Sequence, residues 1–363
     1  MNSEKHMIKL SAIPEIPIIS ENTKVWFIKT SAGKHYKDFL DGKFIAIEWD
    51  KIPPKIVKSK QSKEHKLNYI KKQYPKEKNT NNILGQLERF FLEIKSGDYV
   101  LIPSKGKTKI AIGIVNNLIH CGDSKKDKNK NGGKCPYKIK RRVKWLKETE
   151  ASFDIYLYKI FCVSHSVSDI TKYSQTVFRN STPLYIKNDQ VNLTLTRTTD
   201  EPLSLCDSIK FYSSILSIKE LVAQLFKFND FYEFELDNKI EIKTVINSPG
   251  LIEIIQSSSP VAVATALIIY KILSNKYPGK GESYSGVPAL IKSISDLFND
   301  KTNRDYIRAQ TENLNARTKR IIEENRGNVE LADWNEKNKE KIKTLAELQI
   351  ILQKAAEDMG IEV

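Results

Sequence analysis

The stretch KSGDYVLIPSKGKTKIAIGIV, residues 95–115, contains two apolar runs on either side of a turn that is rich in Gly and Lys. Apolar runs bounded by turn residues are typical of β-strands, and two such runs joined by a short Gly-containing loop predict a β-hairpin. Asp98, which follows Gly97, is expected to form the turn that precedes the hairpin. Cationic segments flank this apolar hairpin.

The positive charge of the chain is concentrated in its N-terminal half. The formal net charge is +15, but residues 1–180 contain 36 Lys and Arg against 18 Asp and Glu, whereas residues 181–363 contain 23 against 26. An AT-rich genome enriches lysine in its proteins, and this would explain the size of the charge but not its one-sided placement. This asymmetry indicates one module that binds a polyanion and a second module with a different role.

Further elements with a clear pattern surround the hairpin. Strands are predicted for KVWFIKT (24–30), KFIAIEWD (43–50) and KIKRRVKWL (138–146), and helices for residues 62–73 and 83–94. Phe90 and Phe91 lie on the apolar face of the second helix and are predicted core residues.

In this order and spacing, five segments resemble the PUA-like superfamily, specifically its EVE-like and YTH-like branch. The segments are VWFIKTSAGKHYKDFL, FIAIEWD, FFLEIKSGDYVLIP, IAIGIV and RRVKWL, within about residues 22–172. Such modules occur as DNA-recognition domains in modification-dependent restriction systems. The resemblance implies a small curved β-barrel with helices on its rim, and the hairpin at 95–115 would form the inner wall of this barrel, whose outer rim carries the charge. Proteins of this kind flip one base out of a nucleic acid and hold it in an aromatic-walled pocket.

The resemblance also implies which residues border this pocket and which contact the backbone of the nucleic acid. The expected base-binding residues are Trp26, Ser31, Gly33, Tyr36, Trp49 and Asp50. Asp50 would accept a hydrogen bond from an exocyclic amine of the base. The expected phosphate-binding residues are Lys34, Lys105, Lys107, Arg141, Arg142 and Lys144, with His35 and Lys109 as further candidates. Glu48 departs from the family pattern, in which a small residue precedes the tryptophan, and this leaves the identity of the base open.

Several of these residues also have purely structural interpretations. Trp145 lies between apolar neighbours and is favoured as a core residue, and Trp26 and Trp49 fit a core position as well as a pocket. Arg141 and Arg142 would be solvated on a strand face if they bound no phosphate.

The second half of the sequence changes character after a break near residues 180–183. Strands are predicted for LYIK (184–187), VNLTLTR (191–197), YEFEL (232–236) and KIEIKTVI (239–246), with a helix at IKELVAQLF (218–226). Beyond residue 249 the pattern is helical, with VPALIKSISDLF (287–298) and a last helix that places Ile342, Leu345, Leu352 and Met359 on a coiled-coil-like seam.

The predicted fold class is therefore α+β, with four segments. They are an extended arm (1–21), a PUA/EVE-like β-barrel with rim helices (22–175), a small mixed strand and helix domain (181–248) and a helical assembly region (249–363).

No enzyme motif is present. The sequence lacks G-x-x-x-x-G-K-[ST], G-x-S-x-G and H-E-x-x-H, so a non-enzymatic role is favoured. The alternative is a Mg²⁺-dependent nuclease that uses Glu241 and Lys243, with Asp230 and Asp237 upstream. Four scattered cysteines, Cys121, Cys135, Cys162 and Cys206, predict neither a disulfide framework nor a zinc site, and no metal or cofactor is expected.

The expected partners follow from these features. They are nucleic acid, with DNA preferred to RNA, a second copy of the chain bound through the C-terminal helices, and a separate nuclease or motor subunit. The apolar segment 254–273 is favoured as a buried helix because its uninterrupted part is about half of what a spanning helix needs; the alternative is a membrane-acting defence effector. No signal peptide is predicted in the first 17 residues, and the cytoplasm is the expected location.

Overall fold

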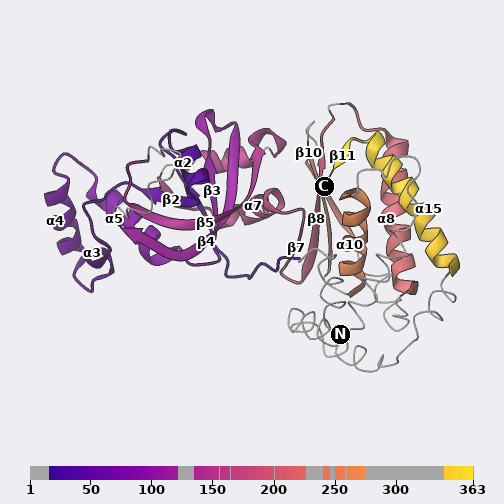
Figure 1. Ribbon diagram of the computed structural model, residues 1–363, viewed down its shortest axis with the longest axis horizontal. Helices are drawn as coiled ribbons and strands as arrows, with labels where there is room; N and C mark the ends of the chain where they lie inside the picture. The colour runs from indigo at the N-terminus through magenta and orange to yellow at the C-terminus, as the bar shows by residue number, and fades with distance from the viewer. Residues whose placement is uncertain are drawn as a thin grey trace, which may run out of the picture. The chain divides into compact units, whose positions relative to one another are not determined.

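The protein is an α+β molecule that divides into two compact units. The computed structural model describes residues 16–121, 135–154, 156–163, 165–199, 201–225, 240–245, 250–257, 260–274 and 339–362 (Figure 1). One unit, here called the basic unit, comprises Asn22–Thr182, and the second unit comprises the residues on either side of it. The break that the sequence predicts near residues 180–183 coincides with this division.

The basic unit is built on a curled six-stranded sheet with the order β2-β5-β4-β3-β1-β6. The strands are β1 (Val25–Ile28), β2 (Phe44–Ile47), β3 (Tyr99–Pro103), β4 (Lys109–Cys121), β5 (Ile139–Glu150) and β6 (Val167–Asp169). The pair β1 and β3 is parallel and the other pairs are antiparallel. Register shifts between β4 and β5 bend the long strands, and the sheet curls into a half-barrel, visible in Figure 1.

The predicted hairpin at residues 95–115 is confirmed. Strands β3 and β4 pair from Tyr99 with Ile114 to Pro103 with Ile110, and a turn at Lys105–Lys107 joins them. The side chains of β3 are all buried, which agrees with the expected inner wall. Asp98 does more than form a turn, because its buried carboxylate accepts hydrogen bonds from three different donors, described below.

The basic unit also contains several short helices. They are α2 (Tyr36–Asp41), α3 (Pro54–Lys58), α4 (Lys63–Gln73), α5 (Thr80–Glu88) with the π-helical turn Arg89–Glu93, α6 (Leu157–Phe161) and α7 (Ser174–Ser181). Three 3₁₀ turns, Lys105–Lys107, Ala151–Phe153 and Thr171–Tyr173, complete the elements of this unit. The predicted helices over 62–73 and 83–94 are present, and Ser62 caps α4 by accepting a hydrogen bond from the His65 backbone N–H. Phe90 and Phe91 are buried, as predicted.

The second unit combines a twisted sheet with three long helices. Its strands are β7 (Leu184–Lys187), β8 (Gln190–Arg197), β9 (Glu241–Val245), β10 (Gly250–Ser257) and β11 (Ile361–Glu362), in the order β11-β8-β10-β9, with β7 also paired to β8. Helices α8 (Leu205–Leu225), α10 (Pro260–Ser274) and α15 (Lys339–Asp358) lie side by side next to this sheet in Figure 1 and share its apolar core. The predicted elements at 232–236 and 287–298 lie outside the described residues.

The division predicted at residue 248 is wrong. Residues 250–257 form strand β10, not helix, and this strand pairs with β9 on one side and β8 on the other. The segments 181–248 and 249–363 therefore share one sheet. The described end of the expected extended arm, residues 16–21, also belongs to this unit, since the Ile19 backbone N–H donates to the Ile186 carbonyl oxygen at 2.9 Å, and the Ile186 N–H donates to the Pro17 oxygen at 3.0 Å.

The apolar seam of the last helix packs inside the second unit. Leu345, Leu352 and Met359 are buried in the core that α15 shares with α8 and α10. The predicted coiled-coil seam is thus an intramolecular contact in this structure.

The segment 254–273 is divided between the end of β10 and helix α10. The helix is buried along most of its length, from Val261 to Ile272, as the favoured interpretation predicts. Within the described part of the chain, no helix combines enough length and hydropathy to cross a bilayer.

Candidate nucleic-acid interface

The loop after β1 adopts a backbone conformation that is uncommon for L-residues. Ser31, Ala32 and Gly33 have φ angles of 52°, 55° and 88°. A Cβ atom on Gly33 would lie 2.2 Å from the Lys105 Cα, so only glycine lets the loop pack against the β3–β4 turn. Thr30 anchors the loop, since its hydroxyl donates to the Pro103 carbonyl oxygen at 2.7 Å. The loop therefore holds the exposed Ser31 side chain in a defined place.

Trp49, at the end of β2, has a φ angle of 77°. A positive φ is an outlier for a bulky residue, and it costs on the order of 1–3 kcal/mol. The half-buried indole meets the Tyr74 ring edge to face, with centroids 5.2 Å apart. The Tyr74 hydroxyl accepts a hydrogen bond from the Lys51 backbone N–H at 3.0 Å, and the Lys51 ammonium lies 5.5 Å from the Tyr74 ring centroid. Burial raises the pKa of the Tyr74 phenol.

Residues 135–138, just before β5, connect the first loop to the end of β2. The Tyr137 and Ser31 hydroxyl oxygens are 2.8 Å apart and share a hydrogen bond. The next residue, Lys138, donates its backbone N–H to the Asp50 Oδ1 at 2.8 Å. The His35 ring meets the Tyr137 ring edge to face at 5.1 Å. Three segments that are distant in the sequence thus meet here.

Tyr137 was not singled out from the sequence, although two of its features are visible there. It follows Cys135-Pro136 and directly precedes the most basic strand of the chain. Its neighbour Cys135 is half-buried, and burial raises the pKa of the Cys135 thiol. Neither feature indicates that Tyr137 contacts Ser31, because that contact depends on the closure of the barrel.

Trp26 is a core residue and not a stacking partner, which corrects the expectation. Its side chain is fully buried, and its Nε1–H donates to the Asp98 Oδ2 at 2.9 Å. The Asp98 carboxylate also accepts the backbone N–H groups of Lys24 and Lys95, at 3.2 and 2.8 Å. This arrangement holds β1 against the turn before β3 and leaves no ring face for a base.

Tyr36 is also removed from the set of base contacts. Its side chain is 6% exposed, and its hydroxyl is buried without a hydrogen bond of good geometry. Burial raises the pKa of the Tyr36 phenol, and the carboxylates of Glu148 and Glu150 raise it further. The neighbours of this phenol are thus the carboxylates of β5.

Arg141 is buried, which corrects its assignment as a phosphate ligand. Its side chain is 4% exposed, and its Nη1 donates to the Phe90 and Ile94 carbonyl oxygens at 2.8 and 2.6 Å. Burial lowers the pKa of the guanidinium. Side chains alternate along β5, so Arg141 points inward with Ile139 and Val143 and satisfies carbonyl groups at the end of the π-helical turn.

The other expected phosphate ligands are exposed. Lys34, Lys105, Lys107, Arg142 and Lys144 all have exposed side chains. The Lys107 ammonium donates to the Phe161 carbonyl oxygen at 3.1 Å, and Lys109 forms an ion pair with Glu150 at 3.3 Å. Trp145 is half-buried, and its Nε1–H donates to the Phe39 carbonyl oxygen at 3.0 Å, which agrees with the structural interpretation.

The second unit shows no assembled nuclease site among the described residues. Glu241 and Lys243 are exposed on β9, an edge strand, whereas Asp230 and Asp237 lie outside the described residues. In the described part of the chain, no three His, Cys, Asp or Glu side chains gather in a way that could hold a metal ion.

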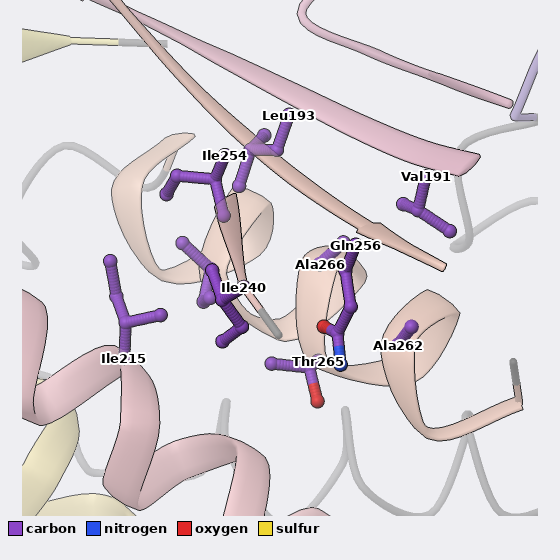
Figure 2. Close-up of a pocket in the computed structure, with 10 residues that line it drawn as sticks. Val191, Leu193, Ile215, Ile240, Ile254, Gln256, Ala262, Thr265 and Ala266 are labelled. Atoms are coloured by element: carbon purple, nitrogen blue, oxygen red, sulfur yellow. The ribbon is translucent and has the colours of Figure 1, made fainter. Parts of the chain in front are cut away.

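A small cavity lies in the core of the second unit, between β8, β10, α8 and α10. Figure 2 shows the Gln256 amide directed toward Thr265 across it, among aliphatic side chains. Its volume of about 10 Å³ corresponds to roughly one water molecule, so it cannot admit a nucleotide.

Comparison with known proteins adds one match. Residues 24–167, from β1 to β6, match the model of a family described as "Domain of unknown function (DUF8426)". No curated protein and no solved structure matches the chain.

Proposed function

We propose that the basic unit is a PUA-like module of the EVE-like and YTH-like branch that binds nucleic acid and holds one flipped base against Trp49. The observation that carries this proposal is the meeting of three segments: Ser31, the strained Trp49 with Asp50, and Tyr137. Strained residues in a rigid framework cluster at ligand sites, where the surrounding structure holds them in place. The curled half-barrel supports the fold assignment.

The chemistry of these side chains fits the recognition of a base. The Trp49 indole offers a ring for stacking, which recovers part of the few kcal/mol that unstacking a base costs. The Asp50 carboxylate keeps one oxygen besides the one bonded to Lys138, and this oxygen can accept a hydrogen bond from an exocyclic amine. The Ser31–Tyr137 hydroxyl pair, which the neighbouring Lys138 connects to Asp50, supplies a further donor and acceptors.

The exposed lysines and Arg142 supply the electrostatic part of binding. Residues 22–182 contain 34 Lys and Arg against 15 Asp and Glu. Each phosphate contact releases counterions, so the affinity falls as the salt concentration rises. We propose DNA rather than RNA as the target, a modified base as the one recognised, and prokaryotic defence or restriction in the cytoplasm as the setting.

The second unit then serves assembly. We propose that it binds a second copy of the chain or a separate nuclease or motor subunit, which would raise the apparent affinity of the module through multivalency. The apolar seam of α15 is already packed inside the unit. The support for this role is therefore a set of exposed apolar residues on α8, Leu205, Ile209 and Leu216.

The test is a binding assay on the full-length protein. Labelled duplexes that differ in one central base, modified or unmodified, are titrated and followed by fluorescence anisotropy at about 50 and 200 mM salt. We expect Trp49→Ala to weaken binding by roughly 5- to 150-fold, the range of one lost stacking contact. Leu92→Ala, a matched change of an exposed apolar residue on the π-helical turn, is expected to leave binding unchanged. If no oligonucleotide binds even at the lower salt concentration, the proposal is wrong.

A further inference from the structure

Two tyrosines of the basic unit expose their rings to solvent. Tyr158 is 57% exposed and Tyr156 is 43% exposed, and no other Phe, Tyr or Trp side chain whose burial is described in this unit is classed as exposed. Tyr156 directly precedes α6 and Tyr158 lies within it. The apolar residues of this helix, Leu157, Ile160 and Phe161, are buried. The rings are thus excluded from a core that their own helix helps to form.

The first tyrosine is held in place by a buried ion pair. Asp154, which is completely buried, accepts hydrogen bonds from the Arg179 Nε and Nη2 at 2.6 and 2.8 Å, and from the Tyr156 backbone N–H at 3.0 Å. The Arg179 guanidinium lies 5.3 Å from the Tyr156 ring centroid, and the Lys159 ammonium lies 4.9 Å from it. The Tyr156 backbone and the Arg179 guanidinium beside the Tyr156 ring are therefore held in place before any ligand binds.

The second tyrosine rests on another aromatic ring. Tyr158 meets Phe161 edge to face, with centroids 6.0 Å apart and an interplanar angle of 86°, and Phe161 packs against the buried Phe27. An aromatic side chain that is already ordered loses little conformational entropy when a ligand stacks on it.

Lysines connect this surface to the loop that carries Ser31. The Lys107 ammonium lies 5.6 Å from the Phe161 ring centroid in addition to its bond with the Phe161 carbonyl. Two residues earlier, Lys105 packs its backbone against Gly33. Contacts thus connect the loop after β1 to the β3–β4 turn, and the β3–β4 turn to α6 through the buried Phe161.

We propose that Tyr156 and Tyr158 form a stacking platform for unpaired nucleotides that flank the recognised base, with Lys105 and Lys159 contacting their phosphates. This inference rests on the proposed function. Every base has a π-face, so stacking on tyrosine tolerates any sequence, and cations between the rings suit a polyanion. The charge of the basic unit supports nucleic acid as the occupant over a protein, because lysine is depleted in protein interfaces, whereas exposed lysines lie beside these rings.

The platform predicts that affinity depends on unpaired nucleotides. The full-length protein is titrated with three labelled probes: a fully paired duplex, the same duplex with a central mismatch, and an unpaired ten-nucleotide strand. We expect Tyr158→Ala to weaken binding of the unpaired strand by roughly 5- to 100-fold, in line with the loss of one stacked base. Tyr158→Phe keeps the ring and is expected to bind within about twofold of the unchanged protein. Leu92→Ala again serves as the control at an exposed apolar position.

The outcomes separate this inference from the proposed function. If the unchanged protein binds the mismatched duplex and Trp49→Ala weakens it, but Tyr158→Ala binds every probe normally, the platform is refuted and the base-binding site stands. If no probe binds at all, both are refuted. If Tyr158→Ala and Tyr158→Phe lose affinity equally, the phenol and not the ring is responsible, which also refutes stacking. Selective loss on the unpaired strand, restored by Tyr158→Phe, supports it.

Discussion

Gly33 provides a direct test of how the loop after β1 is positioned. Gly33 and Gly97 have nearly the same φ angle, +88° and +89°, so an alanine at either site carries the same backbone penalty, about 1–2 kcal/mol. The two sites differ in space. A Cβ on Gly97 would meet no atom within 4 Å, whereas a Cβ on Gly33 would lie 2.2 Å from both the Cα and the backbone N of Lys105.

The difference between the two variants isolates the contact with Lys105. Because backbone atoms cannot move aside like the end of a side chain, we expect Gly33→Ala to cost about 1–3 kcal/mol more than Gly97→Ala, as overpacking does. Urea unfolding followed by tryptophan fluorescence measures this, since three of the four tryptophans lie in the basic unit. Equal costs for the two variants would show that the loop does not rest on the β3–β4 turn, and the placement of Ser31 would lose its support.

Two further predictions concern buried groups. Asp154→Ala leaves the Arg179 guanidinium buried without its carboxylate and is expected to destabilise the basic unit by about 3–5 kcal/mol in urea unfolding. The double variant with Arg179→Met is expected to recover part of this loss. No recovery would argue against the ion pair. Burial raises the pKa of the Cys135 thiol and restricts access to it, so iodoacetamide should label the exposed Cys162 faster than Cys135, as peptide mass spectrometry would show. Equal labelling rates would contradict the burial of Cys135.

Local patterns in the sequence predicted most elements of the basic unit but not the direction of every side chain. The hairpin at 95–115, β1, β2, β5 and helix α4 occur where apolar runs and turn residues place them. Trp26 was misassigned because all four residues of β1 are buried, so strand periodicity cannot distinguish a pocket face from a core face.

The inward direction of the Arg141 side chain is indicated by the sequence of β5. Ile139 and Val143 are the apolar residues on either side of it at a spacing of two, which places Arg141 on the same inward face of β5. The positive charge of Arg141 favours a phosphate ligand, whereas this alternation favours a buried side chain, and the structure follows the alternation. A buried arginine becomes acceptable only because carbonyl groups at the end of the π-helical turn need donors, and that turn is distant in the sequence.

The boundary in the second unit failed for a different reason. The apolar run of β10 and the apolar helix α10 are separated by QSSSP (256–260), and the run before this break is short; short apolar runs do not distinguish a buried strand from a buried helix. Only the pairing of β10 with β8 and β9 decides it. Long-range pairing of this kind cannot be read from a single sequence.

The order of the two units along the chain shows where the positive charge is concentrated. The N-terminal arm pairs with β7, so the chain leaves the second unit after residue 21, forms the basic unit, and returns after residue 182. Counted on these boundaries, the inserted unit carries a formal charge of +19 and the remainder of the chain −4. The excess positive charge is therefore confined to the inserted unit, which also contains the Ser31, Trp49 and Tyr137 cluster and the exposed tyrosines. A lysine-rich composition of the whole chain would not produce this confinement, which is what a module that contacts a polyanion requires.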